Sequence, residues 1–137
     1  MKKLILILIL TIPLIVKSQE GDGYISRLDI SGEKTERLTP GAMNSVFYIS
    51  AEMIVFNITT PQTDSVSHIF IFRDFEKLSS IGGVHFYSGT FVILEPNTPA
   101  RDFPDAVLTM AQENKTCIMD VEFRNNKNKF EFLIILN

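Results

Sequence analysis

The chain has 137 residues and a formal net charge of −3, with 13 basic residues against 16 acidic ones. This length suits one domain with its own core. The acidic balance disfavours nucleic acids and anionic membrane surfaces as partners, because both carry negative charge.

The amino-terminal segment has the layout of a signal peptide. Lys2 and Lys3 precede an apolar run, Leu4–Val16, that is shorter than the roughly 17–25 residues of a membrane-spanning helix. Val16 and Ser18 then occupy positions −3 and −1 of a cut before Gln19, where a signal peptidase requires small or modest side chains. The alternatives are an uncleaved anchor, which would be the chain's one membrane contact, and a core element.

We therefore expect residues 1–18 to be a Sec-type signal peptide cleaved near Ser18–Gln19, and residues 19–137 to be one secreted or periplasmic domain. Cleavage removes three basic residues and leaves a net charge of about −6. The chain has one cysteine, Cys117, so this exported domain must be stable without an intramolecular disulfide.

Apolar and β-branched residues predict strands along most of the mature chain. A short strand at 24–30 and a weak one at 35–41 come first. The run 46–60 follows, and its apolar set changes sides near Met53–Ile54, which indicates a bulge, a bend or burial on both faces. Further strands are expected over the following ranges: 66–73, 84–95 and 106–112.

The connections between these strands carry turn and cap residues. Asp74 is predicted to cap a single helical turn that ends at Gly82 or Gly83. Gly89, inside the strand at 84–95, indicates a bulge or close packing. The proline-rich segment 96–105 is predicted to be a loop. Residues 104–113 fit a helix or a strand, and the strand is favoured because the segment is short and strongly β-like sequence follows it.

The last 22 residues predict a hairpin. Phe123 is expected opposite Phe130, and this register also pairs Cys117 with Leu136, with a turn centred on Asn126–Lys127. The same register places Glu122 opposite Glu131 and Arg124 opposite Lys129. Three apolar side chains then lie on the outer face and form an expected interaction patch: Ile118, Leu133 and Ile135.

These elements predict an all-β domain of about seven strands, arranged as a small antiparallel meander barrel or a two-layer sandwich. No catalytic, metal or cofactor-binding residue is assigned. Cys117 alternates with core residues, so we expect a buried, unreactive thiol. His68 and His85 lack further ligands at metal-site spacing, and the carboxylates Asp102 and Asp105 alone make a weak case for a hydrolase.

The expected function is therefore a non-catalytic exported binding or interaction module with a protein partner. The alternative is a small barrel that carries an apolar ligand, lined by four residues: Phe70, Phe86, Phe132 and Ile134.

Overall fold

The computed structural model describes residues 21–33, 35–60, 66–124 and 126–137. The expected signal peptide lies outside these residues. Nine strands are present in the described part of the chain: β1 (Gly23–Ser31), β2 (Glu36–Leu38), β3 (Ser45–Ile49), β4 (Met53–Thr60), β5 (Val66–Ile81), β6 (Val84–Leu94), β7 (Arg101–Glu113), β8 (Thr116–Phe123) and β9 (Asn126–Leu136). Among the described residues, no helix is long and apolar enough to cross a membrane.

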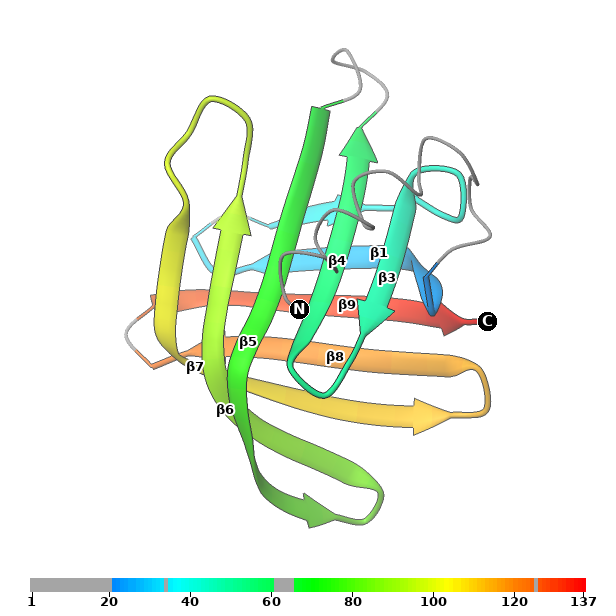
Figure 1. Ribbon diagram of the computed structural model, residues 1–137, viewed down its shortest axis with the longest axis vertical. Coiled ribbons are helices and arrows are strands. Elements are labelled where there is room, and N and C mark those ends of the chain that lie inside the picture. The colour runs from blue at the N-terminus through cyan, green and yellow to red at the C-terminus, as the bar shows by residue number, and fades with distance from the viewer. Residues whose placement is uncertain (1–20, 34, 61–65, 125) are drawn as a thin grey trace.

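The strands form one antiparallel meander that closes on itself (Figure 1). From β3 to β9 each strand pairs with the next, and β9 pairs with β1 along most of both strands. β1 meets β3 at Gly23 and Phe47, which completes an eight-stranded barrel. β2 is an additional strand on the later half of β1. The predicted all-β fold is confirmed, and of its two forms the structure adopts the barrel.

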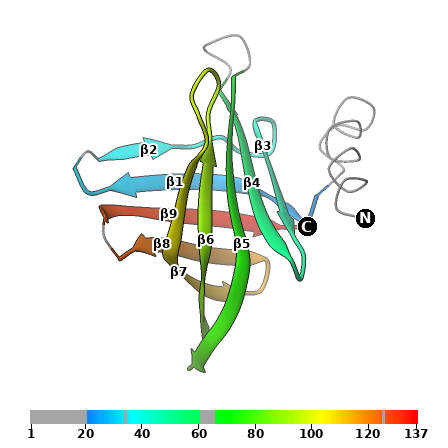
Figure 2. The same cartoon turned by 60° about the vertical axis from the view of Figure 1, so that its left-hand side comes forward.

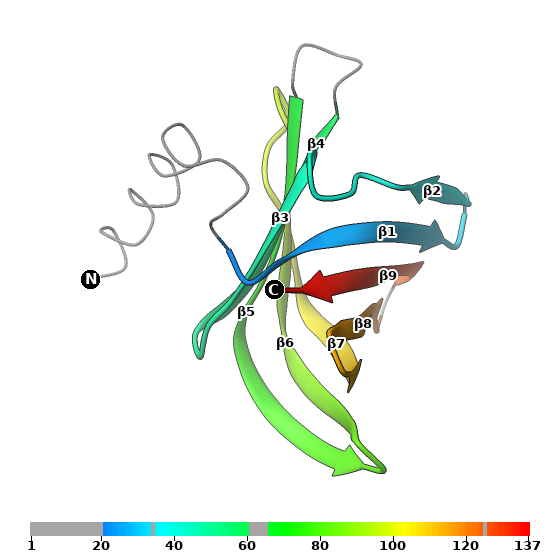
Figure 3. The same ribbon diagram turned by 90° about the vertical axis from the view of Figure 1, so that its right-hand side faces the viewer.

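The barrel is flattened into two layers. Strands β1, β2, β8 and β9 run across β3, β4 and the first part of β5 (Figure 2). The long strands β5, β6 and β7 bend and so reach from one layer to the other (Figure 3). Their pairing shifts register between Arg73 and Glu76 and again between Gly89 and Phe91, and such bulges bend a strand.

The core between the layers is built largely from phenylalanine. The rings of Phe56 and Phe132 stack with centroids 3.9 Å apart. Five phenylalanine side chains are fully buried: Phe47, Phe56, Phe72, Phe91 and Phe132. Each contributes roughly 1.5–3 kcal/mol by leaving water, so this part of the interior holds the fold together without a disulfide.

The run 46–60 was expected to be one strand, and this is wrong: it forms β3 and β4. Ile49 pairs with Ile54, and the Ser50 N–H donates to the Met53 carbonyl at 3.0 Å across a tight turn. The change of apolar side near Met53 therefore marks a chain reversal. This split adds a strand, and the described residues form nine strands where about seven were expected.

The helical turn expected after Asp74 is also absent, because β5 continues through this segment to Ile81. Asp74 adopts a φ of 53° and lies within the bulge of the β5–β6 pairing. Asp tolerates this left-handed conformation better than most residues. The residue that was expected to begin a helix thus bends a strand.

The segment 104–113 is strand, as favoured, and belongs to β7. β7 begins earlier than expected, at Arg101, so the predicted proline-rich loop is shorter. Pro104 lies between Phe103 and Ala106, where the β6–β7 pairing shifts register. A bulge is one of the few sheet positions that accept proline.

The closing hairpin is confirmed, but its predicted register is wrong by two residues. Val121 pairs with Phe130 and Cys117 with Ile134. Glu122 therefore lies opposite Lys129, and Asp120 lies opposite Glu131. The turn lies two residues earlier than expected, since Phe123 pairs with Asn126.

Candidate functional site

A pocket of about 440 Å³ opens at one end of the barrel. The two layers diverge at this end (Figure 3). The pocket lies between β5, β6 and β7 on one side and β1, β2 and the β8–β9 hairpin on the other. Its lining combines apolar and polar side chains: Ile30, Glu33, Glu36, Leu38, His68, Phe70, Ile93, Glu95, Arg101, Phe103, Phe123, Asn128 and Phe130.

The floor of the pocket is aromatic. Phe70 and Phe130 contact each other with ring centroids 5.7 Å apart, and Phe123 lies 5.8 Å from Phe130. Phe103 extends the cluster, with its ring 4.6 Å from that of Phe123. Phe70 and Phe130 are buried and belong to the core, while Phe103 and Phe123 are half-buried. The floor of the pocket is therefore the end of the hydrophobic core that faces the opening.

One wall of the pocket carries paired charges. The Arg101 guanidinium donates to Glu95 with Nη2 and Oε1 2.6 Å apart. The other carboxylate oxygen of Glu95 lies 3.8 Å from Nδ1 of His68. Glu95 follows β6 and Arg101 begins β7, so the short connection between these strands brings the two side chains together. The carboxylate of Glu95 is thus neutralised within its own wall.

The opposite wall carries two carboxylates, Glu33 and Glu36. Both residues are exposed, and among the described residues neither carboxylate has an ion-pair partner. The backbone N–H of Glu33 donates to Oδ1 of Asn128 at 3.3 Å. Gly32, with a φ of +134°, packs so closely on Asn128 that an added Cβ would collide with it. Asn128 thus joins the β8–β9 hairpin to the β1–β2 turn at the rim.

The four residues expected to line a ligand cavity are divided by the fold. Phe70 lines the pocket. Phe132 and Ile134 are fully buried in the packed core. Phe86 alternates with Tyr87, which packs on the core, and therefore lies on the outer side of β6.

Sequence reasoning missed Phe103, Phe123 and the charged rim. Phe123 had been assigned to the inner face of the hairpin, but only as a core residue. The one available signal was the pair Glu95 and Arg101, which flank the proline-rich connection. No periodicity in the sequence indicates that this connection lies over a pocket.

The expected interaction patch is brought together on the outside of the barrel. Ile118 pairs with Leu133 across the β8–β9 ladder, and Ile135 pairs with Thr116 on the same face. Ile118 is 39% exposed, while Leu133 and Ile135 are half-buried. The three side chains therefore form a small apolar area.

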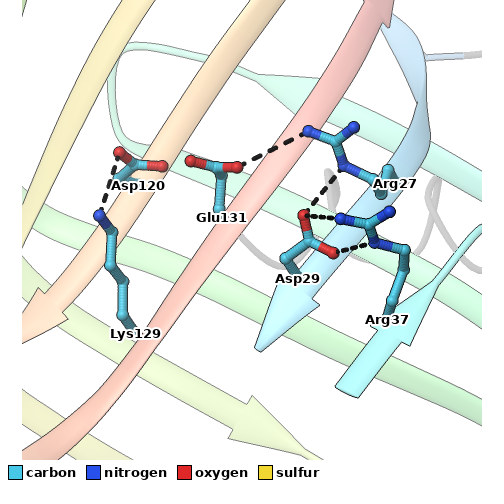
Figure 4. A network of polar contacts seen from close by, with 6 residues as sticks. All are labelled: Arg27, Asp29, Arg37, Asp120, Lys129 and Glu131. Carbon is cyan, nitrogen blue, oxygen red and sulfur yellow. Dashed lines mark hydrogen bonds and ion pairs between the residues drawn. The ribbon is translucent and has the colours of Figure 1, made fainter. Parts of the chain in front are cut away.

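A polar network lies beside this patch on the outer face (Figure 4). Asp29 accepts from Arg37 at 2.7 Å and lies 3.0 Å from Nε of Arg27. Arg27 also approaches Glu131, with 3.7 Å between Nη2 and Oε1. These contacts join β2, β1 and β9, so they strengthen the sheet where β2 has been added.

Asp120 and Glu131 form a pair of carboxylates in this region, directly opposite each other on β8 and β9. Burial, and next the charge of Glu131, raise the pKa of Asp120 to about 6. Lys129 opposes this shift from 3.7 Å away. The pair is half-buried on the outer face of the sheet and lines neither described pocket, so we expect it to act on stability.

The remaining chemical groups lie apart from the pocket. Cys117 is buried, and burial raises the pKa of its thiol to about 11, so the thiolate is scarce at neutral pH. His85 and Ser80 share a hydrogen bond of 2.7 Å at the exposed end of the β5–β6 hairpin. Neither residue lines a described pocket in which a substrate would be held.

In the described part of the chain, no group of three or more His, Cys, Asp or Glu side chains is placed to hold a metal ion. No protein-family model, curated protein or solved structure matches the sequence or the fold.

Proposed function

We propose that this protein is a non-catalytic binding protein that holds a small, largely apolar molecule in the pocket at the end of the barrel. The observation that carries the proposal is the 440 Å³ pocket with its aromatic floor. Pockets of roughly 300–1,000 Å³ with apolar walls and a few polar groups are typical of small-molecule sites.

The packing below the pocket limits how a ligand is held. Phe72, Phe91 and Phe132 are fully buried beneath the floor, so the ligand does not extend through the barrel. It is bound at the mouth, with its apolar part against Phe103, Phe123 and Phe130. Its polar part then faces the charged rim, where water remains accessible.

A neutral fluorescent probe, N-phenyl-1-naphthylamine, tests this proposal by its rise in fluorescence on entering an apolar site. The unmodified protein is expected to bind one probe molecule. Phe103→Trp places a larger side chain in the pocket and should weaken binding by about tenfold or more, as expected when a site loses the volume it needs.

The matched control is Phe86→Trp, which makes the same exchange on the outer side of β6. This variant should bind the probe as the unmodified protein does. If the unmodified protein does not bind the probe, or if both variants weaken binding equally, the proposal fails.

A protein-interaction module is the second candidate, supported by the cluster of Ile118, Leu133 and Ile135 on the outer face. A protein partner would cover this apolar area. The measurement is the mass of the purified protein in solution over a range of concentrations. A concentration-dependent increase that Ile118→Glu abolishes would favour this candidate, and a monomer at every concentration would remove self-association as its form.

We also infer that the protein acts in the periplasm or outside the cell. The support is the charged and apolar pattern of residues 1–18. A pocket exposed at the end of a barrel suits capture of a molecule from that space.

A further inference from the structure

We propose that the pocket selects an amphipathic organic cation, meaning an apolar chain or ring that carries an amine or quaternary ammonium group. This rests on the proposed binding function and adds the charge of the ligand to it. Two features support it: the distribution of charge around the pocket and the chemistry of its floor.

The described side chains of the rim carry more negative than positive charge. They include three carboxylates, Glu33, Glu36 and Glu95, against one guanidinium, Arg101. Arg101 is already bonded to Glu95 at 2.6 Å, so its charge is not available to an anionic ligand. Glu33 and Glu36 face the pocket from the other wall, without an ion-pair partner among the described residues.

The paired charges lie on one wall of the pocket, and the two carboxylates without an ion-pair partner among the described residues lie on the other. Glu95, Arg101 and His68 form a connected set on β5, β6 and β7. Glu33 follows β1 and Glu36 begins β2, on the far side of the opening. A cationic head group placed toward this second wall gains two carboxylates and gives up no existing ion pair.

The floor also favours a cation. A phenyl ring presents a negative face, to which an ammonium group within about 6 Å is attracted. Phe103 and Phe123 are half-buried and lie between the core and the rim. They can therefore contact both the apolar body of the ligand and the lower side of its head group.

The same pocket disfavours the binding of an anionic ligand. An anion would approach Glu33 and Glu36 without a free positive charge in the described rim to compensate. Binding an anion well would require Arg101 to leave Glu95, which would expose an unpaired carboxylate in the same pocket. The same geometry that attracts an ammonium group thus rejects a carboxylate or phosphate.

Three probes with one chain length test the charge preference by calorimetric titration of the full-length protein: octyltrimethylammonium, octanoate and 1-octanol. The cation should bind at least about tenfold more tightly than octanoate, with octanol between them. The preference should shrink when salt is raised from about 0.05 M to about 0.5 M, because the rim is open to solvent and its field is screened.

The double substitution Glu33→Gln and Glu36→Gln should weaken the binding of octyltrimethylammonium by about tenfold and leave the binding of octanol unchanged. The control pair is Glu76→Gln and Glu113→Gln, which removes the same charge from exposed residues outside this pocket. An equal effect from the control pair would show a general charge effect and overturn the proposal.

The outcomes distinguish this inference from the proposed function. Octanol binding together with equal or tighter binding of octanoate would overturn the cation preference and leave the apolar site in place. Failure of all three probes, together with failure of the neutral naphthylamine, would overturn both.

Discussion

At the scale of single residues, Ser45 is the polar residue buried at the junction of β1 and β3. Its hydroxyl oxygen accepts from the Ile25 N–H at 2.9 Å, and the hydroxyl donates to the Gly41 carbonyl at 2.6 Å. β1 and β3 share only one register pair, at Gly23 and Phe47. The side chain of Ser45 therefore replaces part of the missing backbone ladder where the barrel closes.

Ser45→Ala is expected to destabilise the protein by about 1–3 kcal/mol, because the buried Ile25 N–H loses its acceptor. Urea unfolding measures the change, with the slope of the transition unchanged. Ser79→Ala, an exposed serine on β5, is the control and should change stability by less than about 0.5 kcal/mol. A similarly small loss for Ser45→Ala would contradict the role given to this hydroxyl.

The raised pKa of Asp120 predicts that the stability of the protein depends on pH. This pKa rises from 3.8 in an unperturbed carboxyl group to about 6 in the folded protein. The folded state therefore holds this proton more tightly than the unfolded state does. The resulting stabilisation is complete below about pH 3.8 and is lost as the pH rises through about 6.

Asp120→Asn removes this titration and keeps a donor opposite Glu131. We expect the melting temperature to rise by roughly 3 °C near pH 7.5 and to change little near pH 4. Glu122→Gln is the control, since Glu122 also lies near Lys129, at 3.6 Å, but is largely exposed. Equal shifts for both variants at both pH values would show that burial of Asp120 has no special effect.

At the scale of the elements, Gly89 sets the packing of β6 against the bend of β5. A Cβ at this position would lie 2.9 Å from the Arg73 carbonyl oxygen and 3.0 Å from Cβ of Phe75. Both neighbours belong to the bulged part of β5, and the first is backbone that cannot rotate away. Glycine is therefore needed here for close approach of the two strands.

Gly89→Ala should destabilise the protein by about 1–3 kcal/mol, as overpacking of a core commonly does. Thermal and urea unfolding measure the loss. Ser88→Ala, one residue earlier on the outer side of β6, is the control and should have little effect. Unchanged stability in Gly89→Ala would mean that the bend relaxes without cost.

The same elements show what a sequence pattern can and cannot specify. Alternation identified nearly every strand, because inward and outward side chains differ in polarity. It did not separate β3 from β4, since a turn and a bulge both shift the phase of alternation. It also gave a β8–β9 register that is wrong by two residues, because a slip of two keeps every side chain on its own face.

The site was less predictable than the strands for a related reason. The pattern places Phe70 and Phe132 alike on the inner face, yet Phe70 lines the pocket and Phe132 is in the packed core. Their difference is one of depth along the barrel, which depends on how the layers diverge. The positions of Glu33 and Glu36 depend likewise on β2, a strand of only three residues.

At the scale of the whole molecule, closure of the barrel brings the two ends of the described chain together. The Asn137 side chain donates to the Gly21 carbonyl at 2.7 Å, and its backbone N–H donates to the Asp22 carbonyl at 2.9 Å. Four residues, 19–22, lie between the proposed cleavage site and the start of β1 at Gly23. A mature chain cut there would retain all of the described strands.

The proposed export predicts one defined product. The exported protein should begin at or close to Gln19, which amino-terminal sequencing and intact mass determine, and it should be more acidic than the precursor by three charges. Ile7→Lys with Leu8→Lys places two charges in the apolar run and should keep the protein inside the cell with Met1 in place. Recovery of the unmodified protein in the membrane fraction with an intact Met1 would instead identify an anchor. The pocket would then act at a membrane surface, and its ligand would be captured beside the lipid.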